Sequence, residues 1–224
     1  MALKLLTAPT AEPVTLADAK LHCRIDDTAQ DAWLTVAIAA ARRHAEMVTR
    51  RALVTQQWKV VLDQFPRPGM NISNANWYGP QWGITPGPLS VSSPEGRTGY
   101  ELFLPMPPLQ SVDSISYYDQ ATGVLTLLDP SQYIVDDVSE PARITPAYGT
   151  SWPATQNRIN AVEVTFTCGF GAPSDVPEGI QNWVLIRVGT LYENREEVAL
   201  MNRGKIEPLP YVDLLLDPYR VVSF

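Results

Sequence analysis

The stretch Val162-Glu-Val-Thr-Phe-Thr-Cys168 and the stretch Ser174-Asp-Val-Pro-Glu-Gly-Ile180, with two glycines between them, decide the fold class. In the first stretch every second residue is apolar, which is the period-two pattern of a half-buried strand. In the second stretch Ser174 or Asp175 can cap a helix, and Pro177 suits its first turn. A strand followed directly by a helix predicts a protein of the α+β class.

This helix is expected to be long and to fill the region 174–204. Its apolar residues recur at helical spacing and form one stripe, made of Ile180, Trp183, Val184, Val188 and Leu191. Arg187 interrupts the stripe, either as a paired structural residue or as an interface anchor. A charged run ends the helix, and Gly204 is a suitable stop.

Upstream of this junction the period-two pattern recurs, so the region 54–173 is predicted to be a β-rich insert with a small antiparallel sheet or sandwich. Trp58, Val60 and Leu62 alternate with more polar neighbours. The loop Asp119-Gln-Ala-Thr-Gly123 has the length and the closing glycine of a hairpin loop. The expected strands around it are 111–118 and 124–128, with weaker candidates at 133–135 and 142–145.

The region 1–53 is expected to be helical and to form one body with the helix of the region 174–204. Thr15 and Asp18 have capping-box spacing. Asp26, Asp27 and Thr28 offer caps for a second helix of about twenty residues, because apolar positions from Ala29 onward recur at helical spacing. The predicted architecture is therefore a helical body with an inserted antiparallel β-rich region.

Residues 63–99 are rich in proline and glycine, which remove backbone donors and weaken strands, so a long loop is predicted here. Such a loop in a compact domain is usually functional or disordered. Its aromatic residues Trp77, Tyr78 and Trp82 either form an exposed contact arm or pin the loop to the sheet.

Residues 205–224 follow a stiff Pro208-Leu-Pro210 spacer and are too apolar for a free end. Chain ends fray unless they are docked, and exposed apolar patches mark interaction surfaces. Two interpretations stay open from the residues alone. The segment folds back on its own domain, or it is an extended tail that inserts into a partner subunit.

Composition limits the classes of function. The 224 residues are 45% hydrophobic and 18% charged, which is a globular composition, and the formal net charge is -7. That balance argues against tight wrapping of nucleic acid, because phosphate affinity requires Lys and Arg. The only basic cluster, Arg42, Arg43, Arg50 and Arg51, is interpreted as a solvated helix end. No signal peptide or membrane span is expected, since the longest apolar stretch is 32–41.

Residue patterns for chemistry are absent, so no catalytic, cofactor-binding or metal-binding residue is predicted and the chain is not expected to be an enzyme. There is no phosphate loop, dinucleotide fingerprint, zinc-protease motif or nucleophile elbow. His22 and Cys23 are adjacent on a helix and point apart, and His44 is expected to have a surface or a helix-packing role and not a catalytic one. The pairs Asp26-Asp27 and Asp136-Asp137 are interpreted as a helix cap and a strand-end turn.

An ordered series of short motifs covers nearly the whole chain, least clearly over 67–100, and resembles the head-tail connector proteins of tailed bacteriophages. The motifs are Pro13–Asp26, Thr49–Trp58, Leu62–Pro66, Leu104–Val112, Ser114–Asp119, Gln132–Asp136, Arg143–Pro146, Gly149–Pro153, Thr167–Gly171, Val176–Ile180, Leu191–Glu196 and Leu214–Arg220.

The resemblance implies a structural adaptor ring, a dodecamer, in the virion neck of a particle assembled in the host cytoplasm. The implied partners are the portal protein above, the next neck or tail-completion protein below, and genomic DNA that passes through the lumen without sequence-specific binding. No membrane is involved. The apolar tail then inserts into the portal, and the expected portal contacts are Tyr211, Leu214, Leu215, Leu216, Pro218, Tyr219 and Arg220.

Two other functions remain possible from the sequence. A glycan- or peptide-binding β module would use Trp77, Tyr78 and Trp82 as a stacking platform. A hydrolase would require a cleft with perturbed Asp or Glu residues.

Overall fold

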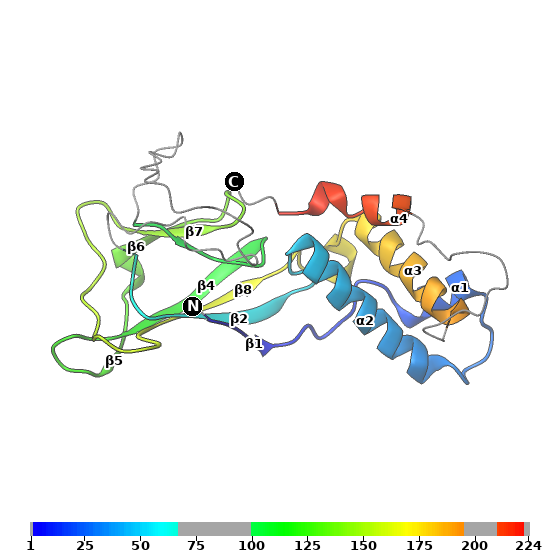
Figure 1. Ribbon diagram of the computed structural model, residues 1–224, viewed down its shortest axis with the longest axis horizontal. Coiled ribbons are helices and arrows are strands. Elements are labelled where there is room, and N and C mark those ends of the chain that lie inside the picture. The colour runs from blue at the N-terminus through cyan, green and yellow to red at the C-terminus, as the bar shows by residue number, and fades with distance from the viewer. Residues whose placement is uncertain (1, 67–99, 195–209, 222–224) are drawn as a thin grey trace, which may run out of the picture. The chain divides into compact units, whose positions relative to one another are not determined.

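The computed structural model describes residues 2–66, 100–194 and 210–221, and it has the mixed α+β composition that the sequence predicts (Figure 1). The chain divides into two compact units. The first, here called the β unit, takes Met1–Ala8 and Gln56–Cys168. The second, the helical unit, takes Pro9–Thr55 and Gly169–Val222.

Two antiparallel sheets build the β unit. The larger has the strand order β1-β2-β8-β4-β5, with bounds Ala2–Thr7, Gln56–Leu62, Val162–Cys168, Leu109–Tyr118 and Leu125–Leu127. The smaller has the order β3-β7-β6, with bounds Leu102–Phe103, Arg143–Pro146 and Tyr133–Asp136. In the larger sheet Val60 lies opposite Val164, which lies opposite Ile115, and all three are buried. The alternation of the sequence thus puts one face of the sheet in the core.

The first strand differs from the sequence-based expectation, which placed residues 1–53 entirely in helices. Ala2–Thr7 form strand β1, paired antiparallel with β2 so that Leu3 lies opposite Val60. The physical reason is visible in Leu3-Lys4-Leu5, which alternates with the period of a strand over too short a run for a helix. All six residues of β1 are exposed.

The helical unit begins with α1 (Leu16–Cys23), and its predicted capping box is confirmed. The Thr15 hydroxyl accepts from the amide of Asp18, and the amide of Thr15 donates to the Asp18 carboxylate. The predicted cap of the next helix is wrong. Helix α2 (Asp31–Thr49) starts after Gln30, whose side chain makes no capping bond, while the Asp27 carboxylate accepts from the amide of Ala29 in the preceding loop.

Helix α3 (Glu178–Glu193) is shorter than predicted, because Asn194 leaves the helical conformation. Residues 195–209, including Gly204, lie outside the described residues. The core of this unit is formed by α2 and α3, and its largest buried side chain is Trp183. His44 stacks on Trp183 at 5.5 Å between ring centroids, which confirms its role in helix packing. None of the described helices is long and apolar enough to cross a membrane.

Candidate docking segment

Residues 210–221, called the C-terminal segment below, form two short helical turns. These are α4 (Pro210–Leu214) and the 3-10 turn η4 (Asp217–Tyr219). The amide of Leu216 donates a hydrogen bond to the carbonyl of Asp213, and the amide of Tyr219 donates one to the carbonyl of Leu216. The expected extended tail is therefore not found in this part of the chain. Helical turns bring apolar residues three or four positions apart onto one side, where they leave water together.

The inward side of the C-terminal segment belongs to the core of the helical unit. Leu216 is 0% exposed, and Leu215 and Tyr219 are partly buried against the same cluster. The indole nitrogen of Trp183 on α3 lies 3.3 Å from the Asp213 carboxylate and donates a hydrogen bond to it. The segment is consequently held by its own subunit through both apolar and polar contacts.

Two further bonds fasten the end of the segment to the residues around the end of α2. The amide of Val221 donates to the carbonyl of Thr49 at 3.0 Å, and Nε of Arg51 donates to the carbonyl of Tyr219 at 2.6 Å. Thr49 is fully buried. Thr49 and Arg51 thus form hydrogen bonds with backbone groups of the C-terminal segment, which lies far away in the sequence.

The predicted solvated helix end holds for Arg43, which is exposed, but is wrong for Arg42 and for Arg51, which bonds to the Tyr219 carbonyl. Arg42 is 5% exposed and pairs with Glu12 at 2.6 Å and with Glu46 at 2.7 Å. Removing such ions from water requires partners of opposite charge, and the two carboxylates supply them.

The Tyr219 ring packs closely against Gly179. A Cβ at position 179 would come within 2.9 Å of the Tyr219 hydroxyl oxygen, closer than such atoms normally lie. The glycine in the first turn of α3 therefore leaves room for the aromatic ring.

Three of the predicted portal contacts, Leu214, Pro218 and Arg220, are exposed and lie on the outward side of the segment. Leu214 is 60% exposed, and Arg220 pairs with Asp217 at 3.1 Å while its side chain stays 48% exposed. The side chain of Tyr211 lies outside the described residues. The structure thus divides the predicted portal contacts into an outward set of three and an inward set of Leu215, Leu216 and Tyr219.

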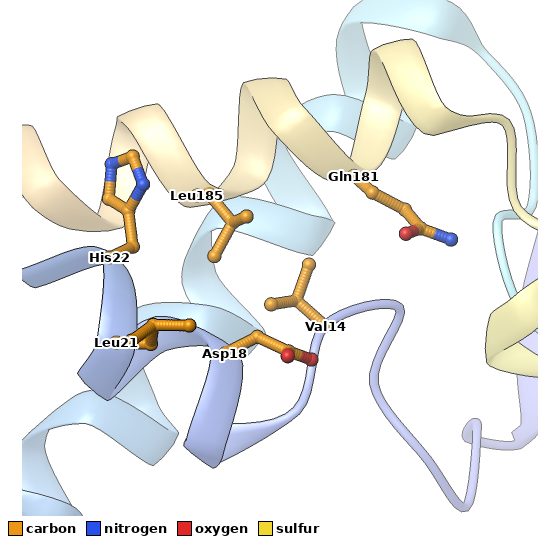
Figure 2. Close-up of a pocket in the computed structure, with 6 residues that line it drawn as sticks. All are labelled: Val14, Asp18, Leu21, His22, Gln181 and Leu185. Carbon is orange, nitrogen blue, oxygen red and sulfur yellow. The ribbon is translucent and has the colours of Figure 1, made fainter.

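A groove of the helical unit lies between α1 and α3 (Figure 2). It has a volume of about 450 Å³ and is lined by Val14, Asp18, Leu21, His22, Gln181 and Leu185. Half of these side chains are aliphatic, and the Asp18 carboxylate already bonds to the hydroxyl and amide of Thr15. The groove offers apolar contact area, and its one carboxylate is engaged at the helix N-terminus.

The ionisable groups whose pKa is shifted, in either unit, have structural roles. Burial, and next the charge of Glu193, raise the pKa of the Cys23 thiol, which disfavours the reactive thiolate. Asp136 accepts from the amides of Val138 and Ser139, which confirms the predicted strand-end turn. Among the described residues no three His, Cys, Asp or Glu side chains gather as metal ligands would. Trp77, Tyr78 and Trp82 lie outside the described residues.

Sequence reasoning missed Arg51 and Gly179 as parts of this site. Both act on the C-terminal segment from distant positions, and the Arg51 bond spans 168 residues. The residues next to Gly179 in the sequence are ordinary for the start of a helix and give no sign of its role. Only the pairing of Gly179 with a bulky aromatic partner shows its purpose, and that partner cannot be read from local sequence.

The fold matches that of chains in structures of gene transfer agent particles. The whole chain matches a chain, 97% of it covered, from a structure titled "Neck of empty GTA particle computed with C6 symmetry", with a TM-score of 0.70 and 22% identity. The same values hold for a chain from the virion of a native gene transfer agent (GTA) particle. A chain from the neck of a native GTA particle with C12 symmetry matches with a TM-score of 0.64 and 24% identity.

Part of the sequence also matches a protein family. Residues 13–75 match the model of the phage gp6-like head-tail connector protein family, so the resemblance to head-tail connectors is confirmed. No curated protein sequence matches the chain. The family and the structural neighbours together support a structural connector role for the chain.

Proposed function

We propose that the chain is a subunit of an adaptor ring in the virion neck, where it docks beneath the portal protein and receives the next neck or tail-completion protein. The single observation that carries the proposal is the family match over 13–75, joined to a neck-protein fold along the whole chain. In this proposal the chain has no catalytic centre, and genomic DNA passes through the lumen of a dodecameric ring without sequence-specific binding.

The C-terminal segment supplies a concrete surface for the portal. Its outward set, Leu214, Pro218 and Arg220, combines an exposed aliphatic side chain with an arginine, which is a frequent anchor of protein interfaces. Its inward set packs against the core of the helical unit and holds this surface in place. Identical copies in a ring would multiply a modest single contact, because each bound copy raises the effective concentration of its neighbours.

A heterologous contact that closes on itself gives a ring and not a filament. The C6 and C12 symmetry of the matched neck structures fits a ring of this kind. The acidic balance of the chain fits a lumen that does not bind the passing DNA tightly.

The two other functions gain no support from a specific feature. The glycan- or peptide-binding module depends on aromatic residues outside the described part of the chain. The hydrolase requires a cleft with perturbed acidic groups, and the one carboxylate of the groove in Figure 2 is bonded to Thr15.

The test is binding of the full chain to its cognate portal ring. The double variant Leu214→Ala, Arg220→Ala is expected to lose at least about tenfold in affinity, because interface anchors of this kind contribute ~1–2 kcal/mol each. The matched control is Met47→Ala, which shortens an equally exposed apolar side chain on α2. Surface plasmon resonance on immobilised portal rings measures both. Unchanged binding of the double variant would refute docking through the outward set.

A further inference from the structure

We propose that successive subunits of the ring join through their sheets, with β1 of one copy pairing edge to edge with β5 of the next. The partner is thus a second copy of this chain, and the contact is heterologous. The inference rests on the ring of the proposed function, and it adds which surfaces form the ring.

The β1 edge is unprotected within the described residues. Its one partner strand there is β2, and all six of its residues are exposed. Edge strands of soluble proteins are normally short, bulged, interrupted by proline or rich in charge. The outer edge of β1 has no proline and only one charged residue, Lys4, with Leu3 at 39% exposed and Leu6 at 41%. Its one irregularity is a register shift between Leu5 and Thr7, so residues 2–5 form a regular edge.

At the opposite end of the same sheet, β5 carries a second apolar edge. Its described partner is β4, and its residues Leu125 and Leu127 are 45% and 64% exposed. Arg158 lies over the ring of Tyr118, the residue opposite Leu125, at 3.8 Å. Tyrosine, arginine and exposed leucine side by side are typical of an interface.

Strand direction fits a ring. All neighbours in the five-stranded sheet are antiparallel, so the first and last strands of the order run in the same direction. Rotation about a ring axis that lies along the strands preserves that direction from copy to copy. The edges would therefore pair in parallel, and the sheet would continue across the subunit boundary.

The two faces of the sheet specify the register. Leu3 shares a face with Thr126. Leu3 lies opposite Val60, and Val60 lies opposite Val164. Two residues before Val164, on the same face, Val162 lies opposite Tyr117, which lies opposite Thr126. Lys4 shares the other face with Leu127. Pairing Leu3 with Thr126 and Lys4 with Leu127 keeps both faces continuous.

In this register a positive charge on β1 lies near a negative charge that follows β5. Asp129 follows Leu127 by two positions with an extended backbone, so it lies on the face of Leu127. Hydrogen bonds from Ser131, from its side chain first, lower the pKa of the Asp129 carboxyl, which keeps the group negative. Diagonal neighbours in a sheet lie about 7–8 Å apart, which is within reach of a lysine, so Lys4 can pair with Asp129 of the next copy. A symmetric β1–β1 contact would instead bring two Lys4 side chains together.

Cysteine cross-linking in assembled neck particles tests the contact. Leu3→Cys and Thr126→Cys are placed separately and together in a Cys23→Ser background, since Cys23 is the more accessible of the two native thiols. A short bis-maleimide is then applied. A mixture of the two single variants is expected to give dimers, each single variant alone only monomers, and the double variant a ladder of higher oligomers.

Each outcome has one meaning. Particles that contain the chain but give no cross-link in the mixture or the double variant would refute edge pairing and leave the ring intact. Dimers from Leu3→Cys alone would refute it in favour of a symmetric β1–β1 contact. Absence of the unsubstituted chain from neck particles would refute the proposed function itself.

A charge series provides a second measurement. Lys4→Glu is expected to lower the rate of cross-linking between the mixed variants about two- to fivefold, as expected for an exposed ion pair. Lys4→Gln should have a smaller effect, and Lys4→Arg should restore the original rate. Equal rates in all three would refute the Lys4–Asp129 contact.

Discussion

The first strand and the C-terminal segment are both short apolar stretches, and the structure treats them in opposite ways. The C-terminal segment folds into helical turns and buries Leu216 completely in its own unit. Among the described residues, strand β1 pairs along one edge, with β2, and all six of its residues are exposed. Apolar sequence thus indicates that a segment needs a partner surface, and the tertiary structure decides whether its own subunit provides it.

The difference follows from geometry. A helical turn gathers apolar side chains on one side, so a single helix pair can cover them. An edge strand presents two faces and a row of backbone groups that bond to water until another strand pairs with them. We therefore expect stability to depend on the C-terminal segment and assembly to depend on β1.

The largest effect is expected for Leu216→Ala. Removing a fully buried leucine from the core of the helical unit should lower the free energy of unfolding by about 2–5 kcal/mol. Urea denaturation followed by fluorescence would measure the change. Leu214→Ala is the matched control, because the neighbouring leucine is exposed and its loss should cost less than about 0.5 kcal/mol. Equal losses would mean that the segment is not packed in its own subunit.

Much of the fold could be predicted from the sequence because its signals are local. The alternation of Val162–Cys168, the hairpin loop at Asp119–Gly123 and the capping box at Thr15 each depend on residues a few positions apart. The stop of α3 at Asn194 could not be predicted, since its charged sequence continues without a breaker.

Less of the site could be predicted from the sequence, because its contacts join residues that are far apart in the sequence. The residues of the C-terminal segment were recognisable by their apolar character. Their division into inward and outward sets depends on Arg51, Thr49 and Trp183, which lie in other elements. The pairing of β1 with β2 likewise joins residues more than fifty positions apart, such as Leu3 and Val60.

A smaller effect is expected for Arg51→Gln, which removes the bond to the Tyr219 carbonyl. The loss of a charge-assisted hydrogen bond to a partly buried backbone group should weaken the attachment of the segment by about 1–2 kcal/mol. Hydrogen exchange at the amide of Val221 would report it as faster opening. Arg43→Gln, on the exposed side of α2, serves as the control. Unchanged exchange would show that the Arg51 bond does not hold the segment.

Acid is expected to weaken the β unit by a still smaller amount. The hydrogen bond from Arg143, followed by that from Ser139, lowers the pKa of Asp136 to about 2. A folded-state pKa below the unfolded value stabilises the fold above about pH 4, and this contribution disappears as pH falls toward 2. Because the pair is partly exposed, we expect ~1 kcal/mol, measured by urea denaturation at pH 5 and pH 2. Asp136→Asn should abolish this part of the pH dependence, and an unaltered dependence would contradict the assignment.

The smallest effect on stability is expected at β1, and it separates folding from assembly most clearly. Leu5→Thr keeps a residue that suits strands at a position that is 39% exposed, so the free energy of unfolding should change by less than about 1 kcal/mol. If β1 is a subunit contact, the same variant should form fewer rings, measured by mass photometry of purified necks. The opposite pattern, large destabilisation with normal ring formation, would mean that β1 is covered within its own subunit, as the C-terminal segment is.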